Sequence, residues 1–138
     1  MPARGQPEPA ALSASEVLFV INGARVVADR SLLQHRTWCA TMRCVYVTDS
    51  AFAPDPGMLL VPLDGTSDRG PACRNDTTEN RRRVRAYAYA QDRFLRGLAS
   101  VRALPAPWLV DIKWYALIDD DSYVFPPNLL GKASRACA

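Results

Sequence analysis

The pattern of apolar and polar positions along the chain predicts strands that alternate with helices. Residues 16–22, EVLFVIN, form a continuous apolar run ending in a polar residue and Gly23, as a strand buried on both faces does. Residues 43–48, RCVYVT, are rich in β-branched and aromatic side chains and predict a second strand. Residues 58–63 predict a third. Residues 113–118, KWYALI, predict a fourth strand, which runs directly into three carboxylates.

Two helices are expected between these strands. Ser31 is placed to cap a short helix that runs to about Trp38, because its hydroxyl can accept a hydrogen bond from a free amide of the first turn. From about Thr78 apolar residues recur at helical spacing as far as Leu98, with Gly97 either inside the last turn or just beyond it. The opposite face of this longer helix is expected to be polar and carries Arg82, Arg85, Asp92, Arg93 and Arg96.

Prolines and glycines mark the segments between these elements. Residues 53–57 and 64–76 are expected to be a turn and a loop, and residues 103–107 a linker, because the residue before each proline is pushed away from helical angles. After the fourth strand, an extended piece at 122–125 precedes a final helix that starts near Pro127. This order of elements predicts an α/β fold with a mostly parallel sheet flanked by helices.

Length, composition and charge limit the number of domains and the class of function. The 138 residues suffice for one domain of common size. We expect residues 1–14, rich in Pro and Ala, to be a disordered tail and residues 15–138 to form the domain. The net charge of +3 is too small to indicate a nucleic-acid partner, and a solvated helix face explains the basic run at 81–85. No apolar run approaches the length of a membrane span.

Four cysteines and one glycosylation sequon bear on the cellular compartment. Cys39, Cys44, Cys73 and Cys137 lack the close spacing typical of zinc sites and redox pairs, and they allow three pairings. Cys39 and Cys44 lie at the end of a predicted helix and the start of a strand, so a disulfide between them is one possibility. The sequon at 75–77 fits a secretory compartment, but such triplets also arise by chance. These features leave the compartment open.

Three consecutive carboxylates, Asp119, Asp120 and Asp121, are the candidate chemical site. Like charges this close raise one another's pKa, and a divalent cation removes that cost. Mg²⁺ and Mn²⁺ take oxygen ligands, usually one or two carboxylates together with substrate phosphates. In an extended segment, Asp119 and Asp121 point to one side and Asp120 to the other. An arbitrary acidic run more often marks a solvated turn, but here the apolar flanks on both sides favour metal or diphosphate binding.

Two further polar residues, Asn22 and Asp49, also follow apolar strands. Ligands of parallel α/β sheets bind at the carboxyl ends of the strands, so we expect both residues to approach the acidic triplet at one crevice. Other motifs fail on their residues. An EF-hand starting at Asp119 needs Gly and Glu at its sixth and twelfth positions, where the chain has Val124 and Leu130. The sequence has neither a phosphate-binding P-loop nor the nucleophile elbow of α/β-hydrolases.

The residues around the triplet resemble a known signature. Residues 114–124, WYALIDDDSYV, are similar to the W-(F/Y)-x-x-x-DDD-(S/T/N)-Y-V pattern of the Fringe and core-1 β-1,3-galactosyltransferase relatives in glycosyltransferase family 31. Thr37-Trp38 and Thr48-Asp49 resemble the TW and TD elements of that family. Residues 91–94 resemble its helix before the acidic strand. The resemblance covers roughly residues 17–130.

The resemblance implies a GT-A fold, a UDP-sugar donor, Mn²⁺ or Mg²⁺, and inverting transfer of a hexose or N-acetylhexosamine to a glycan or glycoprotein acceptor. By position, Asp121 binds the metal, with Asp119 as its second ligand. Asp119 and Asp120 contact the ribose, the donor sugar or metal-bound water, and Asn22 and Asp49 lie near the uridine. Family membership also implies the Golgi or endoplasmic reticulum lumen, with membrane attachment only through an anchor that the chain does not contain.

The family places its acceptor site, its catalytic-base carboxylate and a further metal-binding His in a half that follows the acidic motif. We therefore expect the chain to be the donor-binding half of a GT-A domain, with the acceptor half missing and no catalytic base assigned. The alternative is a catalytically incomplete nucleotide-sugar-binding or metal-binding fragment or degenerate paralogue. A third hypothesis, a phosphotransferase with Asp119 as nucleophile, requires downstream Lys and acidic loops, and after Asp121 the chain has one lysine, Lys132, and no acidic residue.

Overall fold

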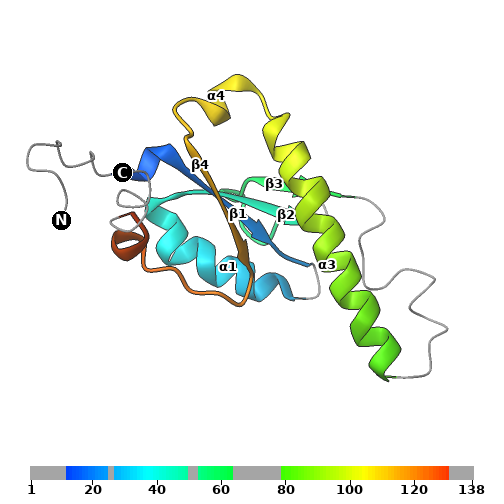
Figure 1. Cartoon of the computed structure of the whole chain (residues 1–138). Helices are drawn as coiled ribbons and strands as arrows, with labels where there is room; N and C mark the ends of the chain where they lie inside the picture. The colour runs from blue at the N-terminus through cyan, green and yellow to red at the C-terminus, as the bar shows by residue number, and fades with distance from the viewer. Residues whose placement is uncertain (1–11, 25–26, 50–52, 64–78, 131–138) are drawn as a thin grey trace, which may run out of the picture.

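The computed structural model describes residues 12–24, 27–49, 53–63 and 79–130, with backbone only for 79–87. At its centre lies a sheet of four parallel strands (Figure 1): β1 Val17–Asn22, β2 Arg43–Thr48, β3 Leu60–Pro62 and β4 Trp114–Asp119. The order across the sheet is β3-β2-β1-β4. The predicted α/β fold with a parallel sheet flanked by helices is thereby confirmed.

The strands follow the apolar runs of the sequence closely. All six residues of β1 are buried, because β1 has a neighbouring strand on each side and helices on both faces. β2 has the predicted bounds. β3 is shorter than the predicted 58–63 and ends at Pro62, which lacks an amide hydrogen and is tolerated because β3 is an edge strand.

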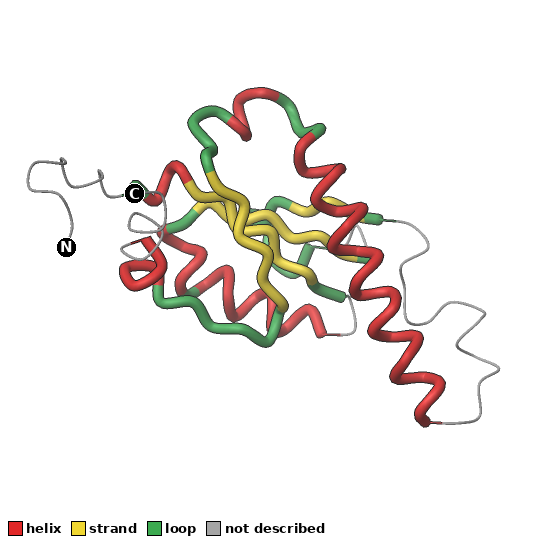
Figure 2. The backbone as a smooth tube through the Cα atoms, in the orientation of Figure 1, coloured by secondary structure: helices red, strands yellow, loops and turns green. Residues whose placement is uncertain are grey.

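Helices cover both faces of the sheet (Figure 2). On one face lie α1, Ala28–Arg36, and the 3₁₀ helix Trp38–Thr41; on the other lies α3, Glu79–Arg102. The side chains of β1 alternate between two apolar clusters. The α1 side contains Val17, Phe19, Ile21, Trp38, Cys39, Tyr46 and Met58. The α3 side contains Leu18, Val20, Val45, Val47, Val61, Leu63 and Val101.

The predicted start of α1 was wrong. The helix begins at Ala28, with Val27 at the N-cap position and no side-chain cap, so Ser31 lies inside it. Ser31 is buried against the end of β1, where a Cβ added to Gly23 would lie 2.7 Å from the Ser31 hydroxyl oxygen. The missing side chain of Gly23 and the small side chain of Ser31 therefore allow α1 to pack closely on the end of β1.

The long helix α3 differs from the prediction at its end and on its packing face. It continues to Arg102, so Gly97 lies well inside it. A Cβ on Gly97 would lie 2.3 Å from Cγ1 of Val47, so the glycine lets α3 approach β2 closely. Arg93, predicted on the polar face, is only 4% exposed, whereas Leu95 of the predicted apolar stripe is 75% exposed. The packing face is therefore rotated from the predicted one.

The segment after α3 also departs from the prediction. Residues 103–107 are not wholly a linker, because the short helix α4, Ala106–Leu109, includes Pro107 in its first turn, where a missing amide is tolerated. Lys113 lies outside β4 and Asp119 is its last residue. Residues 126–130 are helical, starting one residue before Pro127.

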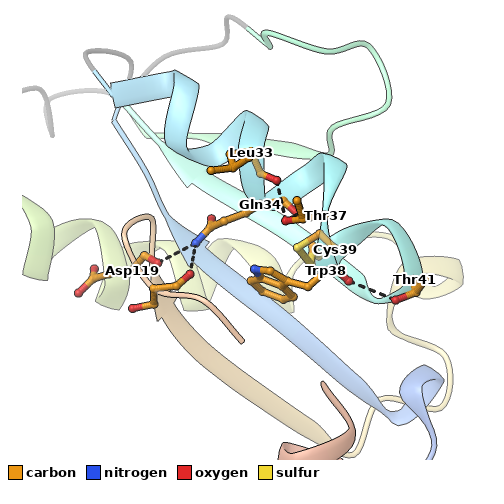
Figure 3. The surroundings of a disulfide bond; sticks show 9 residues. Leu33, Gln34, Thr37, Trp38, Cys39, Thr41 and Asp119 are labelled. Atoms are coloured by element: carbon orange, nitrogen blue, oxygen red, sulfur yellow. Dashed lines mark hydrogen bonds between the residues drawn. A yellow bond between two sulfur atoms is a disulfide. The ribbon is translucent and has the colours of Figure 1, made fainter. Parts of the chain in front are cut away.

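Cys39 and Cys44 form a disulfide across a Cα separation of 5.9 Å, which confirms the pairing that the sequence left possible (Figure 3).

Of the predicted tail, residues 12–14 are described, and the Ser13 amide donates to the Glu16 carboxylate. The predicted loop at 64–76, the sequon, Cys73 and Cys137 lie outside the described residues, as do the side chains of the basic run. No helix in the part of the chain that is described has the length and apolarity to cross a membrane.

Candidate functional site

The carboxyl ends of β1 and β4 meet where the direction of strand order reverses. β1 is followed by α1 on one face of the sheet, and β4 is preceded by α3 on the other. Asn22 at the end of β1 lies directly opposite Asp119 at the end of β4. Asp49 follows β2 at the same edge, two positions beyond Val47, which pairs with Asn22.

A chain of hydrogen bonds from the buried side chains of Asn22 and Arg93 orients Asp119. The Asn22 side-chain amide donates to Oδ1 of Asp119 at 3.4 Å and to the carbonyl oxygen of Ala90 at 3.1 Å. Nε of Arg93 donates to Oδ1 of Asn22 at 3.0 Å. Both polar atoms of the Asn22 side chain thus have protein partners. Its role in this arrangement is to hold the Asp119 carboxylate, and α3 supplies the supporting cation.

The acidic triplet forms a turn in place of the predicted extended segment. The amide of Ser122 donates to the carbonyl oxygen of Asp119 at 3.2 Å, because the strand ends at Asp119 and the chain reverses. The expectation that Asp119 and Asp121 share one side, with Asp120 on the other, was therefore wrong. Asp119 faces Asn22, while Asp120 and Asp121 line a cleft beside α1, where Asp120 lies 3.7 Å from the Arg30 guanidinium.

Gln34 of α1 bridges the two ends of this turn. Its side-chain amide donates to the carbonyl oxygens of Asp119 at 3.1 Å and Ser122 at 2.8 Å (Figure 3). The side chain is 5% exposed, and within the described part of the chain its oxygen accepts no hydrogen bond. Gln34 therefore fixes the backbone that presents Asp120 and Asp121.

The electrostatics of the turn are unfavourable for the ionised Asp120. Burial raises the pKa of Asp120, and the neighbouring Asp121 and Asp119 raise it further, while Arg30 and Arg93 oppose the shift. A cation at the turn favours the ionised carboxylates. No three His, Cys, Asp or Glu side chains of the described residues converge into a complete cage. Mg²⁺ and Mn²⁺ sites commonly take one or two carboxylates and complete their shell with water and substrate oxygens.

A cleft of about 540 Å³ separates the turn from α1. Its size falls within the range of sites for small molecules and cofactors. Exposed Leu33 and Tyr123 give it apolar walls, and the carboxylates lie at the turn. The full lining is Arg30, Leu33, Gln34, Thr37, Asp120, Asp121, Ser122 and Tyr123.

Three contributors to the site had no clear signal in the sequence. Gln34 and Arg30 lie on a helix whose position beside the acidic turn depends on the fold. Arg93 sits among several arginines, and the periodicity placed it on the polar face. The spacing of small residues on α3, Ala90 and Gly97, is the one local sign of the true packing face, with Arg93 between them.

No family model matches the chain, and comparisons with curated proteins and with solved structures find no match either. The likeness to glycosyltransferase family 31 therefore rests on the acidic motif and its flanking elements alone.

Proposed function

We propose that the chain binds a UDP-sugar together with a divalent cation at the carboxyl edge of the sheet, as the donor-binding half of a GT-A-type glycosyltransferase of the family 31 kind. The observation that supports this most is the position of the acidic turn. It lies at the β1/β4 switch point, it is held by Asn22 and Gln34, and it borders a cleft of ligand size. Parallel α/β sheets bind nucleotides at such a point.

The side chains at the turn suit a hard cation. Those of Asp119, Asp120, Asp121 and Ser122 offer only oxygen atoms, and the desolvated Asp120 favours a nearby positive charge. In this proposal Asp121 ligates Mn²⁺ or Mg²⁺ at the cleft, and Asp120 beside it contacts the ribose, the sugar or metal-bound water. Asp119, the second ligand that the resemblance implies, accepts a hydrogen bond from Asn22 in the structure and has to turn toward Asp121 to reach the same ion. Asn22 and Asp49 border the uridine. A bound cation supplies Lewis acidity that offsets negative charge on the departing diphosphate.

The acceptor is a glycan or glycoprotein, and the compartment is the Golgi or endoplasmic reticulum lumen. The Cys39–Cys44 disulfide supports this placement, because disulfides persist mainly in oxidising compartments.

A binding domain without catalysis is the second candidate. The cleft lining contains no carboxylate or imidazole outside the acidic turn, so no described residue there is placed to act as a general base. Release of UDP from UDP-galactose or UDP-N-acetylglucosamine in the presence of Mn²⁺ and a glycan acceptor separates the two candidates. Turnover supports the transferase, and binding without turnover supports the second candidate.

Titration calorimetry with UDP tests the shared claim of both candidates. We expect UDP to bind with Mn²⁺ and far more weakly without it, and Asp121→Ala to lower the affinity by at least about tenfold, or about 1.4 kcal/mol. Asp92→Ala, which removes an α3 carboxylate paired with Arg96, is the charge-matched control and should bind as the wild type does. Equal binding by Asp121→Ala and the wild type, or binding indifferent to Mn²⁺, would overturn the proposal.

A further inference from the structure

Arg30 is the basic side chain of the cleft beside the acidic turn. Of the described residues that line the cleft, it is the only one with a positive charge. Its guanidinium lies 3.7 Å from Oδ1 of Asp120, beyond hydrogen-bonding distance, and its side chain is 52% exposed. Within the described part of the chain no hydrogen bond holds this guanidinium, so its N–H groups can donate to a ligand in the cleft.

The position of Arg30 follows from the anchoring of α1. Gln34 lies four residues further along the helix and therefore on the same face, and it donates to the backbone at both ends of the acidic turn. Ser31 packs against Gly23 at the end of β1. These contacts hold Arg30 beside the carboxyl end of the sheet, where the proposed function places the nucleotide.

The electrostatic surroundings of Arg30 call for an anion. Arg30 belongs to the first turn of α1, where the helix dipole has its positive end and a cation is unfavourable. Asp120 supplies the compensating negative charge. Burial raises the pKa of Asp120, and Arg30 lowers it more than Arg93 does. A divalent cation at the turn therefore competes with Arg30 for the charge of Asp120.

We propose that Arg30 binds the diphosphate of the nucleotide, exchanging Asp120 for phosphate oxygens when the metal ion and UDP enter the cleft. This inference rests on the proposed function and assigns a further ligand-binding residue to the same site. The planar guanidinium offers paired N–H groups that match two phosphate oxygens, and UDP carries more negative charge than one divalent cation neutralises. Arg30 thereby favours nucleoside diphosphates over monophosphates.

Calorimetry with UDP and UMP, each with saturating Mn²⁺, tests the assignment. We expect Arg30→Gln to lower the affinity for UDP by about tenfold, or about 1.4 kcal/mol. The affinity for UMP should fall much less, because UMP lacks one of the two phosphates. Arg30→Lys should keep part of the affinity for UDP, since it retains the charge without the planar fork. An unchanged ratio of UDP to UMP affinity in Arg30→Gln would overturn the proposal.

Arg36→Gln is the matched control. Arg36 lies on the same helix, but it pairs with Asp55 and does not line the cleft. This variant should bind both nucleotides as the wild type does. Losses equal to those of Arg30→Gln would mean that any positive charge on α1 has the same effect, and they would overturn the assignment to Arg30.

Mn²⁺ binding without nucleotide gives a readout of opposite sign. Arg30→Gln removes the charge that competes for Asp120, so Mn²⁺ alone should bind this variant more tightly than the wild type, as measured by the electron paramagnetic resonance of the free ion. Equal or weaker binding would overturn the exchange.

The outcomes separate this inference from the proposed function. A wild type that does not bind UDP with Mn²⁺ overturns the proposed function and this inference together. Binding of UDP by Arg30→Gln as tight as that of the wild type overturns this inference alone.

Discussion

At the scale of single residues, the acidic turn depends on side chains that are almost completely buried. Gln34 donates to both ends of the turn, and Asn22, supported by Arg93, donates to Asp119. A carboxylate that must meet a metal ion within a few tenths of an ångström requires such support. These hydrogen bonds therefore hold the three carboxylates close together despite their mutual repulsion.

Replacing Gln34 tests the support of the turn. Gln34→Leu removes both hydrogen bonds to the carbonyl oxygens of Asp119 and Ser122, and we expect it to lower the free energy of unfolding by about 1–3 kcal/mol. It should also weaken Mn²⁺-dependent UDP binding, because the turn loses its anchor. Gln91→Leu, on the exposed side of α3, is the matched control. Urea unfolding measures the difference, and equal stability of the two variants would show that the bridge contributes nothing.

Replacing Asp120 tests the electrostatic cost of the turn. Because burial raises the pKa of Asp120, the folded chain holds this proton more tightly than the unfolded chain does. Stability therefore falls as the pH rises from the ordinary pKa of 3.8 through the raised value, and the cost is complete once the pH exceeds that value. Asp120→Asn should be more stable than the wild type at pH 7. The gain should shrink as the pH falls through the raised pKa of Asp120 and should be absent below 3.8.

Urea unfolding at pH 7 and pH 3.5 measures this difference, with Asp92→Asn as the control. Asp92 is a half-exposed helix carboxylate paired with Arg96, and such pairs contribute little. Lower stability of Asp120→Asn at pH 7 would mean that the ion pair with Arg30 outweighs burial and repulsion.

At the scale of elements, the strands were predictable and the docking of the helices was not. Continuous apolar runs identified β1 and β2 nearly to the residue, because a strand buried on both faces can be recognised from its own residues without knowing its neighbours. The packing face of α3 was predicted wrongly because it contains Gly97, which has no side chain and lets the helix approach Val47 closely. A search for large apolar residues at helical spacing does not detect such a position. The residues of the candidate site fall into the same two groups, those predictable from the sequence and those that depend on the fold. Its carboxylates followed from the sequence, but Gln34 and Arg93 required the fold.

Gly97 provides the test at this scale. Gly97→Ala places a Cβ against Val47, and we expect a loss of about 1–3 kcal/mol of stability, despite a helix propensity that favours alanine by about 1 kcal/mol. Val47→Ala removes the two Cγ atoms that would lie closest to the new methyl, at 2.3 and 2.7 Å. The double variant should therefore be more stable than the sum of the two single losses predicts. Strictly additive losses in urea unfolding would contradict the close approach of α3 to β2.

At the scale of the whole molecule, the sheet places the acidic turn and the open edge on the same strand. β4 carries Asp119 at its carboxyl end and exposed apolar residues along its length.

The most direct test of the central claim is to locate Mn²⁺ by its paramagnetic broadening of amide resonances in a ¹⁵N-labelled chain. With UDP present and Mn²⁺ below stoichiometry, the first signals to broaden should be those of residues 119–122, followed by Gly23 and Gln34. Asp121→Ala should abolish this selectivity. Broadening centred on other carboxylates, such as Asp55 or Asp92, or no selective broadening at all, would contradict a metal and nucleotide site at the carboxyl edge of the sheet.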